Sequence, residues 1–105
     1  MLRIAFRADA SVTMGTGHVM RSLALADELQ RRGCEVLFVC RRQPGDLVAH
    51  VASRCPVEVL PEGRAGSPVD AAPPHAAWLG VSSAEDAAAT LAALPRPVDW
   101  LVVDH

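Results

Sequence analysis

The feature that most constrains the fold of this chain is a glycine-rich turn between a short apolar strand and an amphipathic helix. The strand is expected over residues 2–7 and the helix over residues 17–32, with Gly15, Thr16 and Gly17 at the turn. Glycine has no Cβ, so the backbone can turn sharply there and another molecule can approach it closely. The helix that follows directs unpaired N–H groups and a partial positive charge at the turn, which favours a phosphate or another anion.

His18 opens this helix and is the candidate catalytic residue. A neutral imidazole is a natural proton acceptor near neutral pH, and the positive end of a helix disfavours the imidazolium. The alternative is a histidine that only caps or packs. Arg7 and Asp9, at the carboxyl end of the first strand, either order the turn or contact a ligand. Arg21 either adds positive charge or pairs with a nearby acid.

Strands and helices are expected to alternate along the rest of the chain. The first helix has its apolar stripe at helical spacing, at Val19, Leu23, Ala26 and Leu29. The patterns predict further strands over residues 35–41, 57–60 and 98–103, helices over 44–53 and 82–94, and a proline-rich irregular loop over 61–77. The order βαβαβαβ predicts an α/β fold with a Rossmann-like parallel sheet, right-handed crossovers and strand order 3-2-1-4.

Composition excludes several classes of protein. Half of the residues are hydrophobic, which argues against disorder, and the 105 residues suffice for one small core. The net charge of −2 argues against non-specific nucleic-acid binding, and no apolar run approaches the length of a membrane span. Three cysteines without close spacing predict neither a disulfide framework nor a zinc site, so a cytoplasmic location fits best.

The last residues of the chain form an apolar run, 98–103, followed by Asp104 and His105. Because the carboxyl ends of parallel strands border the ligand crevice, we expect these two side chains to face it. The alternative is that both are ordinary loop residues. A sheet that stopped here would expose a strand edge and an uncovered face, so we expect the chain to be the front part of a longer protein.

Segments along nearly the whole chain, in order, resemble one known family. The most specific are residues 6–11 and 14–21, and the others are 23–27, 38–41, 78–82, 85–87 and 99–105. They are similar to the N-terminal region of the UDP-2,4-diacetamido-2,4,6-trideoxy-β-L-altropyranose hydrolases of pseudaminic acid biosynthesis. Residues 64–77 follow no pattern of that family.

The resemblance implies a two-domain fold similar to that of GT-B glycosyltransferases, with the substrate between two Rossmann-like halves. Residues 1–105 would be part of the N-terminal half, and the C-terminal nucleotide-binding half would be absent. The family releases UDP from a UDP-linked sugar by attack of water at the anomeric carbon, with inversion and without a metal or cofactor. The match assigns the base to His18, and this chain alone is expected to have little or no activity.

The same resemblance, with the residue chemistry, implies that the UDP-sugar contacts Gly15, Thr16 and Gly17 and the polar side chains Arg7, Asp9, Arg21, Asp104 and His105. Partners are then the sugar nucleotide and the missing C-terminal domain, with neither nucleic acid nor membrane. Two other interpretations stay open. One is a GT-B glycosyltransferase that transfers its sugar to an acceptor other than water, and the other is a non-catalytic nucleotide- or anion-binding α/β module.

Overall fold

Strands and helices alternate along the chain in the computed structural model, which describes residues 1–63 and 81–105. Within these ranges the elements are β1 (Arg3–Ala8), α1 (Gly17–Arg31), β2 (Glu35–Arg41), α2 (Val48–Ala52), β3 (Val57–Leu60), α3 (Ser83–Ala93) and β4 (Trp100–Asp104). Their strands form one parallel sheet in the order β3-β2-β1-β4, which confirms the predicted Rossmann-like fold class and strand order. From residue 64 on, the predicted loop lies outside the described residues, as do residues 78–80 of the family resemblance.

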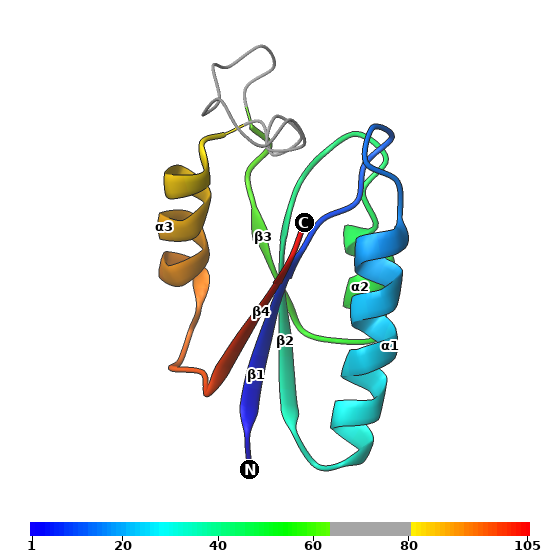
Figure 1. The fold of residues 1–105 in the computed structure, drawn as a ribbon, viewed down its shortest axis with the longest axis vertical. Coiled ribbons are helices and arrows are strands. Elements are labelled where there is room, and N and C mark those ends of the chain that lie inside the picture. The colour runs from blue at the N-terminus through cyan, green and yellow to red at the C-terminus, as the bar shows by residue number, and fades with distance from the viewer. Residues whose placement is uncertain (64–80) are drawn as a thin grey trace.

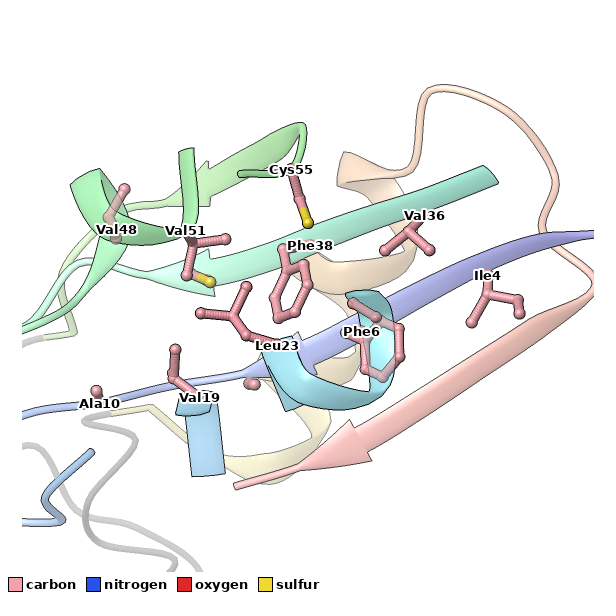
Figure 2. Packing of buried hydrophobic residues seen from close by; sticks show 13 residues of the cluster. Ile4, Phe6, Ala10, Val19, Leu23, Val36, Phe38, Val48, Val51 and Cys55 are labelled. Carbon is pink, nitrogen blue, oxygen red and sulfur yellow. The ribbon is translucent and has the colours of Figure 1, made fainter. Parts of the chain in front are cut away.

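The apolar core lies between the sheet and the helices α1 and α2, which cover one face (Figure 1). Phe6 of β1 and Phe38 of β2 are paired in the sheet, and their rings stack with centroids 5.1 Å apart. Figure 2 shows Leu23 and Val51 reaching this pair from α1 and α2. Burial of these aliphatic and aromatic side chains supplies the main driving force for folding on this face.

Helix α1 follows the predicted apolar stripe. Val19, Leu23 and Ala26 are buried, and Leu29 packs against the core from its edge. The helix ends before Gly33, whose φ of +87° continues the chain in a conformation that favours glycine. None of the described helices combines the length and the apolar character that a bilayer crossing requires.

Helix α2 is shorter than predicted. The pattern predicted a helix over residues 44–53 with Pro44 in its first turn, but the helix begins at Val48. Gly45 adopts a φ of +78°, which interrupts any helix. The carboxylate of Asp46 then stabilises the turn, because it accepts hydrogen bonds from the backbone N–H groups of Gln43 at 2.9 Å and of Val48 at 3.1 Å. The prediction was wrong because it gave Pro44 priority over the glycine that follows it.

Helix α3 covers the opposite face of the sheet and is attached to it by charge (Figure 1). Its buried residues are both polar, Asp86 and Thr90. Its N-terminus is capped as predicted, because the hydroxyl of Ser82 accepts the backbone N–H of Glu85 at 3.1 Å. The helix therefore depends on specific polar contacts more than on an apolar stripe.

The contacts that hold α3 form a buried cluster that we call the Arg7 network: Arg7, Asp9, Arg41 and Asp86. Arg7 is 1% exposed and donates to Asp9 at 2.6 and 2.9 Å and to Asp86 at 2.7 and 3.1 Å. Arg41 donates to Asp86 at 2.8 Å, and its backbone N–H donates to Asp9 at 2.8 Å. Two guanidinium groups thus balance two carboxylates, and no buried side-chain polar atom of the described residues lacks a partner.

The three cysteines are free thiols. Cys40 and Cys55 are buried in the core, and Cys34 packs against it from a partly buried position. Burial, with the nearby Asp9 carboxylate, raises the pKa of the Cys40 thiol to about 12 despite the opposing effect of Arg7. Cys40 therefore stays protonated at neutral pH and packs as a small apolar side chain.

Replacing Arg7 tests whether the Arg7 network holds the fold. Arg7→Met leaves the carboxylates of Asp9 and Asp86 buried with fewer donors, and we expect it to lower the free energy of unfolding by about 3–5 kcal/mol. The control is Arg31→Ala, which removes a guanidinium that is 78% exposed and should change little. Urea denaturation followed by circular dichroism measures both, and equal midpoints for the two variants would contradict the assigned role.

Candidate functional site

Polar side chains from α1 and β4 meet at the carboxyl edge of the sheet. We call His18, Arg21, Ser22 and Asp104 the His18 cluster. The register of the sheet creates it, because Asp104 is paired with Ala8 at the end of β1. The chain leaves β1, passes through the glycine-rich turn and enters α1, so the first turns of α1 return to the end of β4.

The imidazole of His18 lies against the carboxylate of Asp104, with Nδ1 2.7 Å from Oδ1. About one quarter of the His18 side chain, 26%, is exposed. Arg21 grips the same carboxylate with two donors, Nε at 2.6 Å from Oδ2 and Nη2 at 2.5 Å from Oδ1. The predicted site residues His18, Arg21 and Asp104 are therefore brought together, and Arg21 pairs with an acid, one of its two predicted roles.

Asp104 carries the negative charge of the His18 cluster. The hydrogen bonds from Arg21 hold the pKa of its carboxyl well below the ordinary range, against a smaller opposing effect of burial, and the contact with His18 lowers it further. The pKa of Arg21 is raised by the same contact. Both groups are thus ionised near neutral pH, and the imidazole borders a nearly neutralised ion pair.

The glycine-rich turn is closed by Ser11. Its carbonyl accepts the N–H of Gly15 at 2.8 Å, and its hydroxyl accepts the N–H groups of Thr13 at 3.2 Å and Met14 at 3.0 Å. The N–H of Gly15 is therefore used within the turn and does not face a phosphate. Thr16 and Gly17 are exposed, and the first N–H groups of α1, beginning with Gly17, have no partner within the helix.

Arg7 and Asp9 lie in the interior. Each is 1% exposed, and both belong to the Arg7 network. Their hydrogen bonds within the Arg7 network link the ends of β1 and β2 to α3, which is a different role from the predicted ordering of the glycine-rich turn. His105 lies beside this network, with Nε2 3.4 Å from Asp86 Oδ2. Asp104 and His105, although adjacent, thus serve different clusters.

The sequence interpretation missed Arg41 and Asp86. Two signals pointed to them. Arg41 ends an apolar strand just as Arg7 does, and Asp86 and Thr90 are one helical turn apart, which places them on one face of α3. Burial alone would raise the pKa of the Asp86 carboxyl, but the hydrogen bonds from His105, Arg7 and Arg41 outweigh it and hold the pKa well below the ordinary value.

An apolar pocket of about 310 Å³ lies between α3 and β4. Leu91, Leu101, Val103 and His105 are among the residues that line it. Successive residues of a strand point to opposite faces, so this pocket is on the side of β4 away from Asp104 and the His18 cluster. It is therefore a feature of the α3 side of the sheet.

Comparison of the chain with models of protein families, with curated proteins and with solved structures found no match. Among residues 1–63 and 81–105, no three His, Cys, Asp or Glu side chains come together as metal ligands would.

The two glycines of the turn should respond differently to alanine. Gly15 has a φ of +80°, which strains any residue with a Cβ, so we expect Gly15→Ala to destabilise the protein by about 1 kcal/mol. A Cβ at Gly17 would meet no atom within 4 Å, so Gly17→Ala should leave stability unchanged or slightly increase it. Thermal unfolding compares the variants, and a larger loss for Gly17→Ala would contradict this assignment.

Acid should weaken the fold through Asp86. Its pKa is lower in the folded chain than the ordinary 3.8, so its stabilising contribution is present above that pH and falls as the pH drops below it. We expect the free energy of unfolding to decline from about pH 4 downward, and the decline to be shallower in Asp86→Asn. Urea denaturation at a series of pH values measures this slope, and identical slopes for both proteins would contradict it.

Proposed function

We propose that this chain carries the water-activating base of a nucleotide-sugar hydrolase and that His18 is that base. The observation that carries the proposal is a partly exposed imidazole at the carboxyl edge of a parallel sheet, in contact with the carboxylate of Asp104 at 2.7 Å. An imidazole that contacts a carboxylate through one nitrogen and keeps the other for a proton is the usual arrangement of a histidine base.

The proposed substrate is a UDP-linked diacetamido-trideoxy sugar. Water attacks the anomeric carbon, and His18 takes the proton that the water loses. The bond between that carbon and the phosphate oxygen breaks, its electron pair leaves with UDP, and the configuration at the carbon inverts. The N-terminus of α1, beginning at Gly17, offers N–H groups and a partial positive charge to the departing diphosphate.

The family resemblance supports this substrate. It rests on the strand end that holds Arg7 and Asp9 and on the turn from Gly15 to His18. In this proposal the chain forms the N-terminal wall of a GT-B-like cleft, and a C-terminal domain binds the nucleotide and closes the site. The reaction would take place in the cytoplasm, where free thiols stay reduced.

Replacing His18 in the full-length gene product tests the proposal. We expect His18→Ala to lower the rate of UDP release about a hundredfold to ten-thousandfold, because the attacking water loses its base. UDP binding should persist, because in this proposal the C-terminal domain and the backbone N–H groups of α1 hold the nucleotide without the His18 side chain. His50→Ala is the matched control, because His50 is an exposed histidine of α2 and its loss should leave the rate unchanged.

The same assay separates the alternatives. Free sugar formed without an added acceptor supports the hydrolase, whereas product formed only with an acceptor would indicate a glycosyltransferase. Undiminished turnover in His18→Ala would overturn the proposed base. UDP binding without turnover under any condition would favour a nucleotide-binding module.

A further inference from the structure

We infer that Asp104 is the positioning residue of His18: it fixes the imidazole as the tautomer with its proton on Nδ1, which leaves Nε2 as the nitrogen that accepts the proton of water. This inference deepens the proposed function and rests on it for the kinetic part. The tautomer itself is a property of the chain and is testable without any substrate.

The interatomic distances decide between two proton arrangements. His18 Nδ1 lies 2.7 Å from Asp104 Oδ1 and 3.2 Å from Arg21 Nη2. If Nδ1 carried no proton, it would accept from Arg21, but two acceptor atoms would then face each other at 2.7 Å with no hydrogen between them. If Nδ1 carries the proton, it donates to Asp104 at an ordinary hydrogen-bond length.

The contact with Arg21 is compatible with the second arrangement. Arg21 Nη2 donates a hydrogen to Asp104 Oδ1, 2.5 Å away. Nη2 therefore lies close to His18 Nδ1 because both nitrogens donate to the same oxygen. Oδ1 accepts from both donors, as a carboxylate oxygen with two lone pairs does. The proton on Nδ1 therefore follows from the shortest contact of the ring.

Asp104 is itself held in place. Arg21 binds both of its oxygens, and the hydroxyl of the buried Ser22 lies 3.4 Å from Oδ2. The backbone fixes it as well, because Asp104 pairs with Ala8 in the sheet. Val102, two residues earlier and on the same face, packs against the core. A carboxylate fixed from three sides fixes the ring that donates to it, which is the role of the acid in hydrolytic triads.

Nitrogen NMR of the ring measures the tautomer directly. In the 105-residue chain labelled with ¹⁵N-histidine, at a pH where the ring is neutral, we expect the Nδ1 resonance of a protonated nitrogen and the Nε2 resonance of an unprotonated one. The opposite assignment in the unmodified protein would overturn the inference without any substitution.

Asp104→Asn removes the charge and gives Nδ1 an amide neighbour that can donate. We expect the proton to move from Nδ1 to Nε2 in a large part of the molecules. Asp99→Asn is the matched control, because Asp99 directly precedes β4, is exposed and binds the backbone N–H of Arg3 at the other end of the strand. Its His18 spectrum should be that of the unmodified protein, and an unchanged tautomer in Asp104→Asn would overturn the inference.

Enzyme kinetics distinguish this inference from the proposed function, and they are measured in the full-length gene product. Asp104→Asn should lower kcat of UDP release about a hundredfold to ten-thousandfold with KM nearly unchanged, since a misplaced proton disables the base and leaves binding intact. Asp104→Glu, which keeps the acceptor, should recover part of the rate. If His18→Ala loses the rate but Asp104→Asn keeps it, the positioning role of Asp104 is refuted and the base role of His18 stands. If His18→Ala keeps the rate, the base role of His18 is refuted.

Discussion

The buried guanidinium of Arg7 joins three parts of this fold that apolar packing leaves separate. It lies on β1, binds Asp9 beyond the end of that strand, and binds Asp86 on α3. The apolar core occupies the other face of the sheet, so α3 is positioned by charge pairing and hydrogen bonds. Buried ion pairs contribute little net stability compared with apolar packing, but their loss is costly, and they demand one geometry. The Arg7 network therefore determines where α3 and the ends of β1 and β2 lie.

This arrangement also explains how the candidate site is held. The His18 cluster needs the end of β4 beside the first turn of α1, and β4 is an edge strand whose residues are largely exposed. Its pairing with β1 and the packing of Val102 fix one side of it, and the contact of His105 with Asp86 fixes the other. The site thus depends on interactions on both faces of the sheet, although His18 itself lies on only one.

Periodicity predicted the fold because strands and helices of this chain carry clear local patterns. The stripe from Val19 to Leu29 and the apolar run over residues 35–41 specified α1 and β2. Pairing of Arg21 with an acid was one of the predicted alternatives, and the polar residues after the last strand were expected at the same edge of the sheet. The partnership of Arg7 and Arg41 with Asp86 was not predictable, because these residues come from elements far apart in the chain and no local pattern links them. The proposed activity of His18 stays a prediction.

Asp104 and His105, adjacent at the end of β4, contact groups on opposite faces of the sheet: Asp104 contacts His18, and His105 contacts Asp86. These contacts bear on the register of the strand. A slip of one residue exchanges the two faces of a strand. A slip in one direction would place Asp104 where His105 now lies, beside the carboxylate of Asp86, and a slip in the other direction would place His105 where Asp104 now lies, beside His18 and without an acid. Either slip would break both the contact of Asp104 with His18 and the contact of His105 with Asp86, so these two polar contacts favour the observed alignment of an edge strand that has little apolar packing.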